Sequence, residues 1–277
     1  NISSQLKSGQ GSVSIESSGN VDINAAISTS DVEGDLDIIA GGDVTITSLV
    51  SSGEIVTVDA GGNIATVNTT SIIESPSATL TAGGTIDVGL ELNDANPGEI
   101  TASSGGAMTL REYIAEYTED DLIPGTYFRS DPFILSDLDT IDGSITIESE
   151  RSIEAFDVVA GGTGDISLTT TQGDIEVFDV VAVDGRVTLD AQGFTDVEDF
   201  DGGGDVVDNR LGGTIFLNDD EAPIVAGAVD FTVYSLDADD SLDLDAFENF
   251  YAGVGTVAGT VVYDGADPDY LGNGNMY

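Results

Sequence analysis

Cysteine, histidine and tryptophan are absent from this chain, and lysine occurs once, as Lys7. Without cysteine and histidine the chain has no disulfide framework, no thiolate or imidazole metal site and no imidazole base for catalysis. Six basic residues stand against 52 acidic ones, which gives a net charge of −46 at pH 7. Because phosphate groups and anionic membrane surfaces bind basic faces, this balance excludes nucleic-acid binding and attachment to an anionic membrane.

Long apolar runs and early aromatic residues are also missing. No apolar run approaches the roughly 20 residues of a transmembrane helix, so membrane insertion is not expected. The first aromatic residue is Tyr113, so the first third of the chain must build its core from Val, Ile, Leu and Ala. Such residues favour a thin stack of flat strands. The chain starts at Asn1 without an initiator methionine or a signal-peptide pattern, and we read it as a piece of a longer protein.

Aliphatic and polar residues alternate through residues 34–88, and this period of two predicts strands with one buried face. Gly-Gly and Gly-Asn pairs between the strands are predicted to supply positive φ angles at tight corners. One set of corner glycines recurs at intervals of 23, 20, 22 and 22 residues: Gly19, Gly42, Gly62, Gly84 and Gly106. The regular interval predicts a solenoid, in which each coil buries its apolar face on the next.

The sequence therefore predicts an all-β fold, a β-solenoid of about 20–22 residues per coil. Solenoid coils are expected in residues 1–110 and 143–227, separated by an insertion over residues 111–142. Residues 228–277 hold 8 of the 18 aromatic residues and are predicted to form an aromatic-rich, acidic cap or an assembly segment. The alternation predicts these side chains inside: Val13, Ile38, Ile46, Val67, Ile86, Ile147, Leu168 and Leu189.

The start of the insertion has the pattern of a helix N-terminus. Thr109 and Glu112 fit a capping box, which predicts a short helix from Leu110 to Thr118, and an irregular loop is the alternative. After the insertion, the segments 154–160 and 176–182 are near copies of each other. Phe156 and Phe178 hold the same position in the two copies, so their rings are predicted to stack between adjacent coils.

A family resemblance adds to this interpretation. The phrases GGDVTITSLVSSGEIVTVDAGGNI and GGTIDVGLEL resemble the repeats of filamentous-haemagglutinin-like proteins and other large bacterial surface adhesins. The likeness covers about residues 11–110 and 143–190 and rests on the residue pattern and the period of the repeats, without a single diagnostic motif. It implies a right-handed parallel β-helix with two or three walls per coil. It also implies an extracellular or cell-surface location and a role as a stalk or adhesive surface without catalytic residues.

Clusters of acidic residues suggest calcium sites, because Ca²⁺ takes six to eight oxygen ligands from flexible loops. Neither main cluster has the spacing of an EF-hand loop, and a solvated acidic surface or a saline habitat is the alternative interpretation. The candidate ligands are Asp196, Glu198, Asp199, Asp201, Asp205, Asp208, Asp237, Asp239, Asp240, Asp243 and Asp245.

Three functions are compatible with these patterns. The first is a non-catalytic structural or adhesive module of a large exported surface protein, stabilised by divalent cations. The second is a subunit of a self-assembling extracellular fibre or sheet. The third function is that of a polysaccharide-active β-helix enzyme, which the absent histidines and the scattered arginines disfavour. The expected partners are divalent cations, identical protomers, and cell-surface or matrix glycans.

Overall fold

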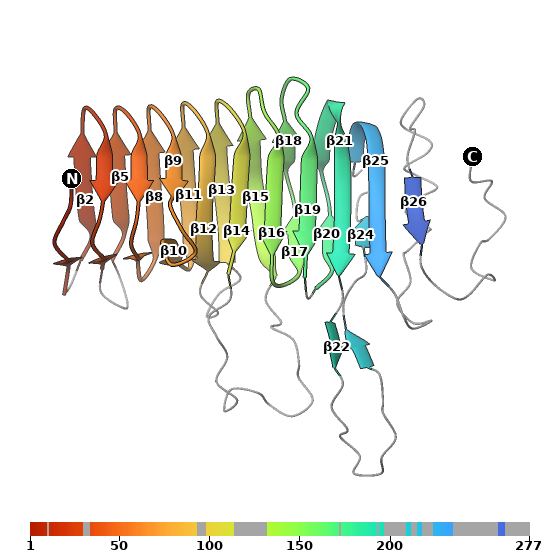
Figure 1. Cartoon of the computed structure of the whole chain (residues 1–277), viewed down its shortest axis with the longest axis horizontal. Coiled ribbons are helices and arrows are strands. Elements are labelled where there is room, and N and C mark those ends of the chain that lie inside the picture. The colour runs from red at the N-terminus through yellow and green to blue at the C-terminus, as the bar shows by residue number, and fades with distance from the viewer. Residues whose placement is uncertain are drawn as a thin grey trace, which may run out of the picture.

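Strands of the chain stack side by side along one axis, from β2 near the N-terminus to β25 (Figure 1). The structure is a computed structural model. It describes residues 1–9, 11–29, 34–92, 98–113, 132–171, 173–192, 194–196, 209–211, 215–217, 224–234 and 260–263. Within these ranges the chain forms strands and turns and no helix, and the strands of the main sheet pair in parallel. The predicted all-β solenoid is confirmed.

One long side of the stack, which we call wall A, contains a strand from each successive coil. Seven parallel pairings join its members from β2 to β21. The strands are β2 (Val13–Ser17), β5 (Leu36–Ala40), β8 (Ile55–Ala60), β11 (Ser77–Ala82), β13 (Gly98–Ser104), β15 (Phe133–Thr140), β18 (Val158–Ala160) and β21 (Val180–Gln192).

The opposite side, wall B, repeats the arrangement in parallel register. Its strands are β3 (Val21–Ile23), β6 (Val44–Ile46), β9 (Ile64–Thr66), β12 (Ile86–Leu92), β14 (Met108–Glu112), β16 (Ile145–Ser149), β19 (Ile166–Thr170) and the second half of β21. In the early coils a third, shorter wall closes each turn. It contains β1 (Leu6–Lys7), β4 (Ile27–Ser28), β7 (Val50–Ser51), β10 (Ile72–Ser75) and the end of β12.

Later coils differ, because short strands extend wall A. β17 (Ile153–Ala155) pairs with the first half of β15, and β20 (Ile175–Val177) and β24 (Ile215–Leu217) follow it. The parallel sheet continues into β25 (Ile224–Tyr234) and β26 (Thr260–Tyr263). A separate antiparallel pair joins β22 (Phe194–Asp196) to β23 (Asn209–Leu211). Of the predicted cap, residues 228–277, the structure describes the end of β25 from residue 228 and all of β26.

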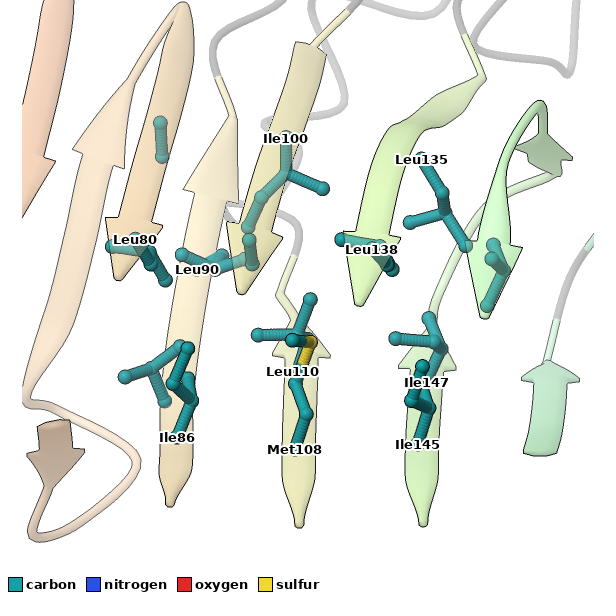
Figure 2. Close-up of a cluster of buried hydrophobic side chains, with 14 of the residues drawn as sticks. Leu80, Ile86, Leu90, Ile100, Met108, Leu110, Leu135, Leu138, Ile145 and Ile147 are labelled. Atoms are coloured by element: carbon teal, nitrogen blue, oxygen red, sulfur yellow. The ribbon is translucent and has the colours of Figure 1, made fainter. Parts of the chain in front are cut away.

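Aliphatic side chains fill the space between the walls, because every second residue of each strand points inward. Ile86, Met108 and Ile145 are register partners and lie side by side in a row across the adjacent strands β12, β14 and β16 (Figure 2). Each Å² of apolar surface that such rows remove from water stabilises the fold by about 25 cal/mol. Six of the predicted inward side chains are no more than 1% exposed: Ile38, Ile46, Ile86, Ile147, Leu168 and Leu189. Val13, in the first coil, is partly buried against this core.

Val67 was predicted inside, and this prediction is wrong, since the side chain is 58% exposed. Strand β9 ends at Thr66, and the chain then turns. The turn is held by Asn68, whose Oδ1 accepts hydrogen bonds from the Thr70 backbone N–H at 3.0 Å and the Thr70 hydroxyl at 2.7 Å. Val67 lies three residues after the buried Ile64, and an odd spacing puts the two side chains on opposite faces of a strand. The inward position belongs to Thr66, the register partner of the buried Ile46.

The corner glycines serve a different purpose from the predicted one. Among the described glycines, positive φ occurs only at Gly11 (96°) and Gly162 (62°). At the Gly-Gly corners the need is space, because the corners of successive coils lie directly on each other. A Cβ atom on Gly61 would lie 2.5 Å from the carbonyl oxygen of Gly41, and one on Gly83 would lie 2.3 Å from that of Gly61. The prediction of positive φ at these corners is therefore wrong.

Polar side chains fix the same corners from coil to coil. The Asn20 Oδ1 accepts the backbone N–H of Asp43 at 3.0 Å, and the Asp43 Oδ1 accepts that of Asn63 at 2.8 Å. The Asn63 Oδ1 in turn accepts the backbone N–H of Thr85 at 2.8 Å. This ladder pairs backbone donors at corners, where strand pairing ends.

The predicted helix from Leu110 is wrong where the structure describes it, because Met108–Glu112 is strand β14. Leu110 is buried and pairs with Val88 on one side and with Ile147 on the other. Strand pairing on both sides outweighs the local capping pattern. Residues 114–131 lie outside the described residues, and the next described strand, β15, begins at Phe133.

Candidate functional site

The predicted calcium ligands are mostly beyond what the structure describes. Asp196 ends β22 and pairs with Asn209 of β23. The other ten, Glu198, Asp199, Asp201, Asp205, Asp208, Asp237, Asp239, Asp240, Asp243 and Asp245, lie outside the described residues. Within the described part of the chain, no three Asp or Glu side chains are grouped so that they could hold a metal ion. The calcium site therefore stays a prediction.

The predicted aromatic stack is confirmed. The rings of Phe156 and Phe178 lie with centroids 4.3 Å apart and planes inclined by 6°. Ladder hydrogen bonds place them, because the Phe156 N–H donates to the Leu135 carbonyl and the Phe178 N–H to the Ala155 carbonyl. Each Phe lies at the corner where one short strand ends and the next begins. Phe156 is 40% exposed, so the stack forms part of the outer surface.

Carboxylates border this stack on the β17 side. Glu154 and Glu176 are register partners on adjacent coils. Partial burial raises the pKa of Glu154, and the charge of Glu176 raises it further. Burial and the charge of Asp174 raise the pKa of Glu176 in the same way. Burial and a neighbouring like charge disfavour the ionised form of each carboxyl group, so Glu154 and Glu176 bind a proton more tightly than free glutamate does.

A second group of carboxylates lies on the other side of the stack. Asp157 follows Phe156 at the corner, and Asp137 holds the matching corner position one coil earlier. Burial, together with the charges of Asp137 and Asp157, raises the pKa of Asp139. The Phe stack is thus bounded by acidic side chains along both edges, which creates a local negative field on the outer surface.

The outer face of wall B contains an arginine between two acids. The Arg111 Nη1 lies 2.5 Å from the Asp87 Oδ1, and the Arg111 Nε lies 3.4 Å from the Glu148 Oε2. The hydrogen bond to Asp87 raises the pKa of Arg111, and the nearby negative charges add to this effect. All three side chains are at least 36% exposed, so the cluster contributes little to stability and relieves part of the repulsion between acids on neighbouring coils.

The interior contains a further ion pair, between Glu112 and Arg151, whose side chains are 1% and 3% exposed. The Ser149 hydroxyl donates to the Glu112 Oε2 at 2.6 Å, and the Arg151 Nη2 donates to the Leu92 carbonyl at 3.4 Å. Glu112 occupies an inward position whose register partners are Leu90 and Ser149. The pair lies at the end of β14, and Arg151 bonds a backbone carbonyl at the end of β12.

Neither arginine cluster was predicted from the sequence. Arg111 and Glu112 were assigned to a helix, whereas in β14 they point to opposite faces. The strand alternation of Met108, Leu110 and Glu112 is the signal that could have placed Glu112 inside. Its pairing with Arg151 could not be predicted in the same way, because the two residues are far apart in the sequence and no repeat relates their positions.

Comparison with protein-family models, with curated proteins and with solved structures gives no match to this chain. No helix within the described ranges is long and apolar enough to cross a membrane. What can be said of function therefore depends on the coil stack and on the side chains of its outer surface.

Proposed function

We propose that this chain is a non-catalytic structural or adhesive β-solenoid module of a large exported surface protein, and that divalent cations, calcium in particular, stabilise it. The observation that carries the proposal is the parallel stack itself, seven coil-to-coil steps from β2 to β21 around an aliphatic interior. Such a stack is a stiff rod whose length grows by about 4.8 Å per coil.

The charge of the surface supports the cation part of the proposal. The net charge is −46, and partly buried carboxylates such as Glu154 and Glu176 lie opposite each other on adjacent coils. Salt at about 0.15 M screens charges only beyond about 8 Å, so carboxylates on neighbouring coils repel one another inside the screening length. Calcium binding to the folded chain would relieve this repulsion and raise the melting temperature with ion concentration.

The test is thermal unfolding of the 277-residue chain in EDTA, in calcium chloride, and in sodium chloride of matched ionic strength. The proposal predicts a higher melting temperature in calcium than in matched sodium. Equal curves in the two salts would refute specific stabilisation by calcium, and the acidity would then be a solvated surface.

A second candidate, a subunit of a self-assembling fibre or sheet, is favoured by the burial of the first coil. Val13 and Ile15 of β2 are only partly buried, whereas their register partners Leu36 and Ile38 are fully buried. The outer edge of such a strand can be continued by a strand of another copy or by a further coil of the same protein. Sedimentation velocity over a range of protein concentrations distinguishes the two candidates, because fibre assembly predicts growing species and a monomeric module predicts one sedimentation coefficient.

A further inference from the structure

The Phe stack ends at Phe156, toward the preceding coil. In β15 the matching corner positions are Ser136 and Asp137, between the partners of Ala155 and Val158. Ser136 is the extra residue of a bulge, and its hydroxyl donates to the Glu99 Oε1 at 2.6 Å. Among the described residues of that coil, no aromatic side chain holds the corner position next to the second face of the Phe156 ring, and Phe156 is 40% exposed.

Negative charge surrounds this ring. Asp137 and Asp157 hold matching corner positions, Asp139 lies two residues beyond Asp137, and Glu154 precedes the ring by two residues. Among the described residues, the ion pairs made by Arg111 and Arg151 involve other carboxylates and none of these four. Burial raises the pKa of Asp139, and the charges of Asp137 and Asp157 raise it further, so these three acids act on one another.

We propose that the second face of Phe156, with Asp137, Asp139 and Asp157 around it, is a docking surface for an arginine side chain of a partner protein. A guanidinium is planar, is charged at every physiological pH and is weakly hydrated, so it stacks on an aromatic ring while it pairs with carboxylates. Lysine supplies the charge without the planar group. The inference rests on the proposed function in one respect, since it names the partner of an adhesive surface.

The direct test is an NMR titration of the ring resonances of Phe156 with three capped tripeptides, in about 0.15 M sodium chloride. The peptides are acetyl-Gly-Arg-Gly-amide, its lysine analogue, and its citrulline analogue, which keeps the planar group without the charge. We expect the arginine peptide to bind about two- to fivefold more tightly than the lysine peptide, and the citrulline peptide to give no saturable shift.

Variants separate stacking from bulk charge. Phe156→Leu should lower the affinity for the arginine peptide to that of the lysine peptide, with binding of either followed through the backbone amide of Asp157. Asp157→Asn should weaken the arginine peptide more than Asp59→Asn, a charge-matched control at an exposed position of β8 on the same wall. The thermal unfolding of each variant establishes that it is folded, and Asp157→Asn still tests the surface if Phe156→Leu fails to fold.

Equal binding of the arginine and lysine peptides, unchanged by Phe156→Leu, would overturn the proposal and leave only general attraction to an acidic chain. Equal losses in Asp157→Asn and Asp59→Asn would overturn it as well. The calcium experiment measures the stability of the whole fold, whereas this titration measures one ring and its neighbours. Each proposal can therefore fail without the other.

Discussion

The Glu112 carboxylate and the Arg151 guanidinium form an ion pair inside the solenoid, where both side chains are shielded from solvent. The two residues come from coils on either side of the chain segment 114–131. A charge in such a place is tolerated only with its partner, because burial of an isolated ion is far more costly than burial of a pair.

Removing one partner should therefore destabilise the chain more than removing both. We expect Glu112→Leu and Arg151→Met each to lower the free energy of unfolding by about 3–5 kcal/mol. The double variant should lose clearly less than the sum of the two, because neither charge is left unpaired. Denaturant unfolding of the four proteins in the cycle measures this coupling. Additive losses would show that the two side chains do not depend on each other.

The alternation of inward and outward residues can be tested at two neighbouring positions of β19. Ile166 is fully buried between its register partners Ile145 and Val187. Ile166→Asp places an unpaired charge there and should cost several kcal/mol, about 3 or more. Ser167→Asp, on the outer face, should stay within about 0.5 kcal/mol of the parent. Equal shifts in melting temperature for the two variants would contradict the observed direction of these side chains.

The close packing of the corner glycines on one another gives a prediction about stability. Gly61→Ala brings a Cβ within 2.5 Å of the Gly41 carbonyl oxygen, so the backbone of one coil must move. We expect a loss of about 1–3 kcal/mol, as for other overpacked sites. The control is Gly19→Ala, at the corner of the first coil, where a Cβ would meet no atom within 4 Å. That variant should be neutral or slightly stabilising, by up to about 1 kcal/mol. A loss in Gly19→Ala as large as in Gly61→Ala would argue against stacked corners.

The raised pKa of Glu154 and of Glu176 links stability to pH. A carboxyl whose pKa is higher in the folded chain than in the unfolded chain binds its proton more tightly when folded. Its contribution to stability is therefore largest below the unfolded value of 4.5 and falls as pH rises through the folded pKa. Glu154→Gln/Glu176→Gln should melt higher than the parent at pH 7, and this gain should shrink toward about pH 4.

The matched control for this pH prediction is Glu16→Gln/Glu54→Gln, which removes two charges from exposed positions. Subtracting its effect removes the general benefit of lowering a charge of −46. Melting curves of both variants from pH 7 to about pH 4 provide the comparison. A gain that is the same at every pH, or the same in both variants, would contradict a local effect at Glu154 and Glu176.

The sequence was informative wherever one coil repeats the next. Period two placed Ile147, Leu168 and Leu189 correctly inside, because register stacking gives the same inward position to each coil. The near copies around Phe156 and Phe178 predicted the ring stack for the same reason. A repeat in sequence becomes a column in space, so its side-chain contacts follow from spacing alone.

Prediction failed where the phase of the pattern was misassigned or where the contacts that decide the structure are distant in sequence. At Leu110 a helical pattern and a strand pattern coincide, and the pairing partners that decide between them are distant in sequence. Val67 was assigned to the same face as Ile64, although their spacing of three residues places them on opposite faces of a strand. The Glu112–Arg151 pair depends on the register across the insertion, which local residues do not encode. Ten of the eleven predicted calcium ligands lie outside the described residues, so these stay predictions.

The spacing of the coils can be measured directly as distances between labelled positions along wall B. Asp22, Thr109 and Thr188 occupy one outward row, with four coil-to-coil steps between the first two and seven between the first and last. Because the chain has no cysteine, spin labels can be attached at cysteines introduced at these positions alone.

Double electron–electron resonance on the Asp22→Cys/Thr109→Cys and Asp22→Cys/Thr188→Cys variants tests the central claim most directly. At about 4.8 Å per step, the parallel stack predicts separations of about 19 Å and about 34 Å between the labelled backbone positions. The second distance must exceed the first by three steps, even though residues 114–131 lie between the labelled positions. A second distance equal to or shorter than the first, as two packed antiparallel sheets would give, would contradict the solenoid.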